Sequence, residues 1–194
     1  MKNISVVGSG TMGNGIAQTF ALYNHNVILF DINDENLEKA NATISRNLSR
    51  MLKKDIITES QMNATIKNIN STNEFNDIIN SDLVIEAVSE NVDLKLSIFK
   101  KLDEKCAKKT ILASNTSSIS ITKLAESTTR KEKVIGMHFM NPVPVMKLVE
   151  IINSKHTSDE TTKEIVNLSE KLNKTPLTVN DYPGFISNRI LMPM

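Results

Sequence analysis

One segment near the start of the chain constrains the fold more than any other: an apolar run that ends in a closely spaced glycine triplet. The triplet is followed by a stretch with helical spacing, then by a second apolar run and an acidic residue. These are residues 4–7, Gly8, Gly10 and Gly13, residues 15–23, residues 27–30 and Asp31. Strand, tight turn, helix and strand in this order predict the first βαβ unit of a parallel sheet.

Further apolar runs extend this sheet. They are continuous rather than alternating, which is typical of strands that are buried on both faces. We therefore predict an α/β fold with a mostly parallel sheet and helices on both of its faces. Thr157 and Glu160 predict a capping box for a helix that precedes the last strand. The additional candidate strands are residues 69–72, 83–87, 111–114, 134–138, 148–152 and 176–179.

The composition excludes several kinds of partner. The chain has 194 residues, 40% of them hydrophobic, and its 23 basic residues nearly balance its 22 acidic ones. Without a basic field we expect no nucleic acid, and because no apolar run approaches the ~20 residues that span a bilayer, we expect no membrane. The three histidines and the single Cys106 lack ligand spacing, so no metal is expected. The first apolar run is too short for a secretory signal, which predicts a cytoplasmic protein.

The chain divides near its end. Residues 1–183 are predicted to form one domain, from which residues 33–67 project as a pair of helices. A breaker cluster at residues 181–184 precedes residues 184–194, which we interpret as the start of a helical domain that is otherwise absent. Apolar residues of this last segment are expected to be exposed. They are Phe185, Ile186, Ile190 and Leu191.

The glycine triplet also predicts a dinucleotide site, because it lies directly after a strand and opens a helix. Gly8 permits the tight turn, Gly10 lets a pyrophosphate approach the backbone, and Gly13 lets the helix pack closely on the strand. Asp31 lies roughly 20 residues farther on, where an acidic residue accepts from the adenosine ribose. An acid there would repel a 2′-phosphate, so NAD is favoured over NADP. The predicted cofactor residues of this segment are Gly8, Gly10, Thr11, Met12, Gly13 and Asp31.

A histidine at the end of one candidate strand precedes a carboxylate on the next. His138 closes the run 134–138, and Glu150 lies within the run 148–152. An imidazole can accept a proton near neutral pH, and a carboxylate on its other nitrogen fixes the tautomer and stabilises the imidazolium. The pair therefore indicates a general base with its orienting acid, although a strand-end histidine is by itself more often structural.

Two longer motifs carry a resemblance to a known family. The segments SNTSS at residues 114–118 and GMHFMNPVPVMKLVE at residues 136–150, together with the glycine loop and Asp31, resemble the NAD-dependent 3-hydroxyacyl-CoA dehydrogenases. Within that family the sequence resembles the short-chain 3-hydroxybutyryl-CoA dehydrogenases in particular. Taken alone, SNTSS would predict a turn and a helix cap, and Asn115 and Ser118 keep that interpretation.

The resemblance covers essentially the whole chain and has consequences for its organisation. It implies a Rossmann-like domain, an acyl-CoA substrate such as acetoacetyl-CoA or 3-hydroxybutyryl-CoA, and a C-terminal helical domain used in dimerisation. A full-length member is expected to be a homo-oligomer. Because such a member would continue beyond residue 194, we expect this sequence to be a shortened form.

The resemblance also implies roles for single residues. His138 would take the proton of the 3-hydroxyl group while hydride leaves C3 for the nicotinamide, giving a 3-oxoacyl-CoA, and would return a proton in the reverse reduction. Glu150 would hold His138 in place. Ser117 would lie near both nicotinamide and substrate, and Asn188 would hydrogen-bond the substrate. The remaining implied contacts are Glu90, Lys95 and Asn141 for NAD and Lys54 for the phosphates of coenzyme A.

Two other functions stay open on the sequence alone. A β-hydroxyacid dehydrogenase of another Rossmann type would act on a free acid with a catalytic lysine, and the pair of His138 and Glu150 argues against it. A protein that binds NAD without turnover would fit a chain whose substrate cleft is incomplete. Activity that survives replacement of His138 would favour the first alternative, and NADH binding without turnover would favour the second.

Overall fold

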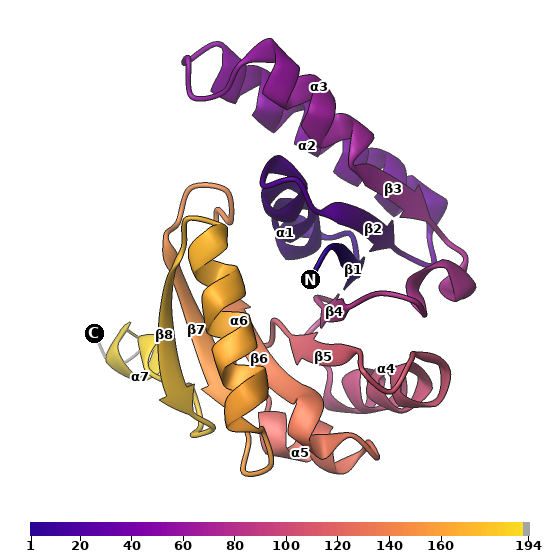
Figure 1. Cartoon of the computed structure of the whole chain (residues 1–194), viewed down its shortest axis with the longest axis vertical. Helices are drawn as coiled ribbons and strands as arrows, with labels where there is room; N and C mark the ends of the chain where they lie inside the picture. The colour runs from indigo at the N-terminus through magenta and orange to yellow at the C-terminus, as the bar shows by residue number, and fades with distance from the viewer. Residues whose placement is uncertain (192–194) are drawn as a thin grey trace.

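An eight-stranded sheet runs through the computed structural model, which describes residues 1–191 (Figure 1). Residues 192–194, the end of the predicted segment 184–194, lie outside the described residues. The strands are β1 (Asn3–Val7), β2 (Asn26–Phe30), β3 (Ile69–Thr72), β4 (Leu83–Glu86), β5 (Ile111–Ser114), β6 (Val134–Phe139), β7 (Leu148–Asn153) and β8 (Thr175–Asn180). The helices are α1 (Thr11–Leu22), α2 (Asp34–Leu52), α3 (Glu59–Lys67), α4 (Val92–Lys105), α5 (Ile121–Glu126), α6 (Asp159–Lys171) and α7 (Ser187–Leu191), with 3-10 turns η1 (Phe75–Ile78) and η2 (Lys131–Lys133).

The strands follow the order β3-β2-β1-β4-β5-β6-β7-β8. Neighbouring strands are parallel except β6 and β7, which are antiparallel. The predicted α/β, Rossmann-like, mostly parallel sheet is therefore confirmed, and each predicted strand is present within one residue of its expected ends. Because the strand order reverses between β1 and β4, a crevice forms at the carboxyl ends of these strands.

Apolar side chains cover both faces of the sheet, because successive strand residues point to opposite sides. Ile85 belongs to the buried cluster that includes residues of α1, α2 and α6, whereas Val84 belongs to the cluster that includes residues of α4 and α5. In Figure 1, α2 and α3 lie together beyond α1, at the top of the view. Continuous apolar strands thus place helices above and below the sheet.

Helix α1 begins at Thr11, four residues before the first residue with clear helical spacing. Its glycines allow it to lie close to its neighbours. A Cβ on Gly13 would lie 1.8 Å from the carbonyl oxygen of Gly8, and a Cβ on Gly15 would lie 3.0 Å from Cβ of Val143 in the loop after β6. Close packing of α1 therefore fixes the glycine loop and that later loop together.

The predicted pair of helices is present as α2 and α3. The side chain of Asn33 caps α2 by accepting from the N–H of Glu35 (2.8 Å), and Thr58 and Gln61 form a capping box for α3. One face of α2 is buried at Leu37, Ala40, Ile44 and Leu48. Among residues 1–191, no helix is both long enough and apolar enough to cross a membrane.

The capping box predicted for Thr157 and Glu160 is wrong. Ser158 caps α6 instead, accepting from the N–H of Thr161 (3.1 Å). The hydroxyl of Thr157 is already engaged, because it donates to the carbonyl oxygen of Val134 (2.7 Å). Two suitable cap residues stand side by side in the sequence, and a contact with a distant strand decides between them.

Candidate active site

The residues predicted to carry the chemistry come together where the parallel strands β1, β4, β5 and β6 end. A cavity of about 350 Å³ lies there, and we call it the His138 hollow. The predicted site residues that line it are Met12, Glu90, Ser117, His138, Asn141 and Asn188. The other lining residues are Ala87, Val88, Asn115, Phe139 and Met140.

The glycine loop leaves open the space that a phosphate group needs. Gly8 has a φ of +99°, and a Cβ there would lie 2.8 Å from the carbonyl oxygen of Ala87. A Cβ on Gly10, in contrast, would meet no atom within 4 Å. Thr11 and Met12 begin α1, and the first N–H groups of a helix have no partner within it and can bind an anion. The loop therefore fits a pyrophosphate at the start of α1.

Asp31 is held at the end of β2 by the glycine loop itself. Its Oδ2 accepts from the N–H and the hydroxyl of Ser9 (2.9 and 2.8 Å), and its Oδ1 accepts from the N–H of Asn33 (3.1 Å). Burial raises the pKa of this carboxyl, but the bonds from Ser9 and Asn33 outweigh burial and hold the pKa below its usual value. A fixed carboxylate suits an acceptor for ribose hydroxyls. The sequence pattern did not single out Ser9, although its place between two loop glycines was a usable signal.

His138 and Glu150 face each other across β6 and β7. The register pairs the two residues directly, and Nδ1 of His138 lies 2.7 Å from Oε2 of Glu150. Glu150 is fully buried, and His138 is 8% exposed at the wall of the His138 hollow. Burial raises the pKa of Glu150, but the bonds from His138 and from the N–H of Ser187 outweigh burial and keep the pKa below its usual value. The Glu150 carboxylate is thus hydrogen-bonded to Nδ1 of His138, which leaves Nε2 free for proton transfer.

Glu90 holds the loop that follows β5. Its Oε1 accepts from the N–H groups of Ser117 and Ser118 (3.0 and 3.1 Å) and from the hydroxyls of Ser118 (2.9 Å) and Thr116. Burial raises the pKa of Glu90, but the hydroxyls of Thr116 and Ser118 and the charge of Lys95 together lower it. Glu90 therefore both lines the His138 hollow and fixes Ser117 at its wall.

Lys95, which the family resemblance assigns to the cofactor, is buried within the protein. It is 1% exposed and is not among the residues that line the His138 hollow. Its Nζ lies 2.6 Å from Oε1 of Glu86 and 3.5 Å from Oε2 of Glu90. Glu86, which the sequence pattern did not single out, is fully buried and accepts from the hydroxyl of Ser114 (2.6 Å). A buried ammonium group requires a charged partner, and Lys95 has two, Glu86 and Glu90. Of these, Glu90 lines the His138 hollow, so Lys95 influences the site by holding Glu90.

Three asparagines contribute to the His138 hollow. Asn188 donates from Nδ2 to the carbonyl oxygen of Ser117 (2.9 Å), which joins α7 to the loop after β5. Asn115, interpreted from the sequence only as a turn residue, accepts from the N–H of Phe139 (2.9 Å) and ties β5 to β6. Asn141 lies in the loop after β6. Ser117 and Asn188, which the resemblance separately assigned to the substrate, are thus in direct contact.

Phe185 is buried rather than exposed. It is 2% exposed, and its ring centroid lies 5.9 Å from that of His138. Ile186 and Ile190 are exposed as predicted, at 40% and 58%, and the side chain of Leu191 lies outside the described part of the chain. The segment after β8 therefore belongs in part to the site.

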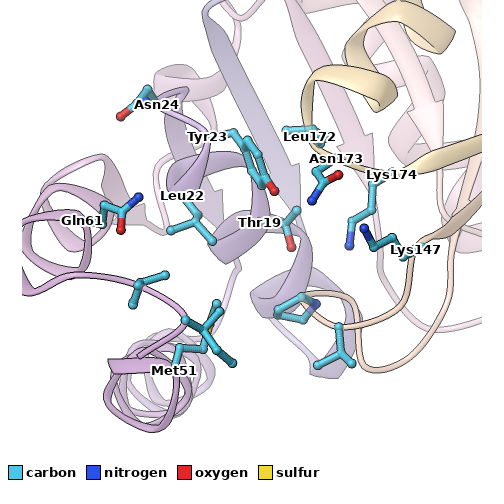
Figure 2. A pocket seen from close by; sticks show the side chains of 14 residues that line it. Thr19, Leu22, Tyr23, Asn24, Met51, Gln61, Lys147, Leu172, Asn173 and Lys174 are labelled. Atoms are coloured by element: carbon cyan, nitrogen blue, oxygen red, sulfur yellow. The ribbon is translucent and has the colours of Figure 1, made fainter. Parts of the chain in front are cut away.

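A second cavity, of about 460 Å³, lies beside α1, and we call it the α1 hollow (Figure 2). Figure 2 shows Met51 and Gln61, from the pair of helices, across the cavity from Lys147 and Lys174. Lys174 is nearly buried and donates to the carbonyl oxygens of Val143 and Met146, which holds the loop after β6. Lys54 does not line this cavity; it is exposed in the turn between α2 and α3, close to Met51.

The described residues offer no metal site. Within residues 1–191, no group of three or more His, Cys, Asp or Glu side chains could hold a metal ion.

Burial raises the pKa of the Cys106 thiol to about 11, so the thiol stays protonated and unreactive at neutral pH.

This arrangement agrees with comparisons to known proteins. The sequence matches the family described as "3-hydroxyacyl-CoA dehydrogenase, NAD binding domain" over residues 3–182. The chain belongs to this family. The domain is the part of these oxidoreductases that binds NAD, and NAD is its cofactor.

Relatives match all or nearly all of the chain. A probable 3-hydroxybutyryl-CoA dehydrogenase of Bacillus subtilis is 47% identical over 194 residues, and the 3-hydroxybutyryl-CoA dehydrogenase of Clostridioides difficile is 46% identical over 191 residues. The crystal structure of (S)-3-hydroxybutyryl-CoA dehydrogenase from Ralstonia eutropha superposes with a TM-score of 0.97 at 47% identity and covers 100% of this chain. The chain spans 68% of the length of the first two relatives and 69% of the third.

Proposed function

We propose that this chain carries the cofactor site and the acid–base pair of an enzyme that oxidises 3-hydroxybutyryl-CoA to the 3-oxoacyl-CoA with NAD and catalyses the reverse reduction. The observation that carries the proposal is the buried contact of His138 with Glu150 (2.7 Å) at the wall of the His138 hollow. The names of the relatives from Bacillus subtilis, Clostridioides difficile and Ralstonia eutropha support the substrate.

His138 acts as general base and general acid through Nε2. In the oxidation Nε2 takes the proton of the 3-hydroxyl group as the C3 hydrogen leaves as hydride, and in the reduction Nε2 returns a proton to the oxygen. Bound NAD would supply the hydride acceptor. Glu150 occupies Nδ1 of His138, fixes the tautomer and stabilises the imidazolium while it exists. Proton transfer of this kind contributes about 10²- to 10⁴-fold to the rate.

The other residues of the His138 hollow hold the two reactants. Ser117 and Asn188, which are already joined by a hydrogen bond, bind the substrate beside His138. Glu90 and Asn141 contact the cofactor. Lys95 acts indirectly, because its ammonium fixes Glu86 and Glu90 from within the protein.

Coenzyme A extends from the His138 hollow toward the α1 hollow and Lys54. The α1 hollow combines apolar residues such as Met51 and Val145 with the amines of Lys147 and Lys174 (Figure 2). Burial and the nearby charge of Lys147 lower the pKa of Lys174, and an anionic group would relieve that repulsion. This chemistry suits an amphipathic ligand that carries phosphates.

Replacement of His138 tests the proposal. We expect this chain, with NADH and acetoacetyl-CoA, to oxidise NADH, and we expect His138→Gln to lower kcat by about 10²- to 10⁴-fold without changing NADH affinity. Absorbance follows NADH oxidation, and NADH fluorescence measures binding. His156→Gln is the matched control, because His156 also pairs with a glutamate, Glu126 (3.5 Å), but lies outside the His138 hollow. Unchanged turnover in His138→Gln would overturn the assignment of the base.

Two further outcomes separate the alternative functions. NADH binding without any turnover would identify a cofactor-binding protein, and turnover of acetoacetate in preference to acetoacetyl-CoA would identify a dehydrogenase of free acids. In the second case a lysine variant, not His138→Gln, would abolish activity.

A further inference from the structure

The segment between β8 and α7 contacts the acid–base pair from a distant part of the sequence. The N–H groups of Ile186 and Ser187 donate to Oε1 of Glu150 (3.1 and 2.8 Å), while Oε2 of Glu150 meets His138. Phe185 packs against the imidazole ring of His138. One oxygen of the carboxylate is therefore held by the segment, and the other holds the histidine.

The other end of this segment is anchored at Asp181. Its carboxylate accepts from the hydroxyl of Ser120 (2.7 Å) and from the N–H groups of Ile121 and Thr122 (3.1 and 2.7 Å). These N–H groups belong to the first turn of α5, where a helix has no internal acceptors for them. Since α5 follows the loop that carries Ser117, Asp181 ties the segment to the part of the chain that continues from that loop.

Between the two attachment points the backbone turns sharply. Gly184 and Phe185 have φ values of +76° and +49°. A positive φ is uncommon for a residue other than glycine and persists only where the surrounding structure holds the residue in place. The buried ring of Phe185 and the two bonds to Glu150 provide that hold on one side, and Asp181 provides it on the other.

We infer that Asp181 is a positioning residue for the His138–Glu150 pair and acts through residues 181–187. With Asp181 anchored, the amides of Ile186 and Ser187 fix the orientation of the Glu150 carboxylate, and this carboxylate keeps the proton of neutral His138 on Nδ1. Without the anchor, the carboxylate rotates and the proton distributes over both ring nitrogens. The effect on turnover rests on the proposed function, but the effect on the tautomer of His138 does not.

Nitrogen NMR of the imidazole rings tests the inference on this chain. The sequence has three histidines, and His138→Gln identifies the signals of His138. We expect the wild type to hold the proton on Nδ1 and Asp181→Ala to lower the ratio of Nδ1–H to Nε2–H about fivefold or more, the effect of losing roughly one hydrogen bond. Glu150→Gln supplies the end point, in which Nδ1 no longer meets a carboxylate.

A matched control separates positioning from a general loss of stability. Asp82 also accepts two backbone N–H groups, those of Lys2 and Asn3 (2.8 and 3.1 Å), but at the start of β1. Asp82→Ala should lower the free energy of unfolding and leave the tautomer of His138 unchanged. The inference is overturned if Asp181→Ala keeps the wild-type tautomer, or if Asp82→Ala shifts it equally.

A milder variant decides the question if Asp181→Ala does not fold. Ser120→Ala removes one of the donors to Asp181 and retains the carboxylate. It should therefore shift the tautomer of His138 in the same direction as Asp181→Ala, but by less. If Ser120→Ala kept the wild-type ratio of Nδ1–H to Nε2–H, the inference would be overturned. Turnover retained in His138→Gln would instead contradict the proposed function and leave the tautomer result standing. The two failures are therefore distinguishable.

Discussion

The cofactor half and the acid–base half of the site are built in different ways. In the cofactor half, Ser9 is hydrogen-bonded to Asp31 within one βαβ unit, and Gly13 in the first turn of α1 packs against Gly8 in the preceding loop. In the acid–base half, His138 depends on a carboxylate from the next strand, which in turn depends on amides that follow β8. Local sequence therefore specifies the first half, and the completed sheet specifies the second.

The largest effect should come from breaking the local half. In Gly13→Ala the new Cβ would lie 1.8 Å from the carbonyl oxygen of Gly8, which is backbone and cannot rotate away. We expect loss of measurable NADH binding and a loss of about 3 kcal/mol or more in the free energy of unfolding. NADH fluorescence and urea denaturation measure the two effects.

Gly10 provides the control for this prediction. A Cβ on Gly10 meets no atom within 4 Å, so Gly10→Ala should fold like the wild type and still bind NADH more weakly, since the new methyl group occupies the space of the pyrophosphate. If Gly10→Ala destabilised the fold as much as Gly13→Ala, the tight packing would not be confined to Gly13.

Acidification should weaken both halves of the site. Glu150 and Asp31 both have a pKa below the usual value. Each therefore adds stability that is complete above its unfolded-state pKa, near pH 4, and that is lost as the pH falls through the lower folded-state pKa. We expect the free energy of unfolding to decrease from about pH 5 to about pH 3. Urea denaturation at a series of pH values measures the decrease.

Two variants assign this decrease to its sources. Protonation weakens the hydrogen bonds that Glu150 accepts from Ser187 and that Asp31 accepts from Ser9. The pH dependence should therefore become shallower in Glu150→Gln and also in Asp31→Asn. If one of the two variants left the curve unchanged, its carboxylate would not contribute to the decrease.

The smallest effect should come from Ser9. In Ser9→Ala the hydroxyl bond to Asp31 is lost, but the N–H bond of the same residue remains. We expect NADH affinity to fall about fivefold, the effect of roughly 1 kcal/mol for one hydrogen bond, while kcat stays unchanged. A change in kcat with constant NADH affinity would contradict the separation of the two halves.

The same contrast explains how much the sequence predicted. The strands, the glycine loop and Asp31 were predicted from residues that are neighbours in the chain, because apolar runs and glycine spacing report local backbone requirements. His138 and Glu150 were also recognised as a pair, since they lie on strands that follow one another. The family resemblance then supplied Ser117 and Asn188, which the structure brings into contact.

Residues whose partners lie far away in the sequence were not predicted. Glu86 forms a buried ion pair with Lys95, and Asp181 accepts hydrogen bonds from the first turn of α5. Phe185 was expected to be exposed because its segment was interpreted as the start of a helical domain that is otherwise absent, yet it is buried against His138. No periodicity within a segment reports such contacts, since they arise only when the sheet is complete.

The antiparallel register of β6 and β7 has a consequence for how the enzyme can diversify. His138 and Glu150 are direct cross-strand partners, and a slip of one residue would turn the carboxylate to the opposite face. The loop between the strands, residues 140–147, contributes to the walls of both cavities but not to this pairing. Substitutions in that loop can therefore change the fit to the substrate, while the two paired strands and the amides that follow β8 keep the histidine and its carboxylate in place.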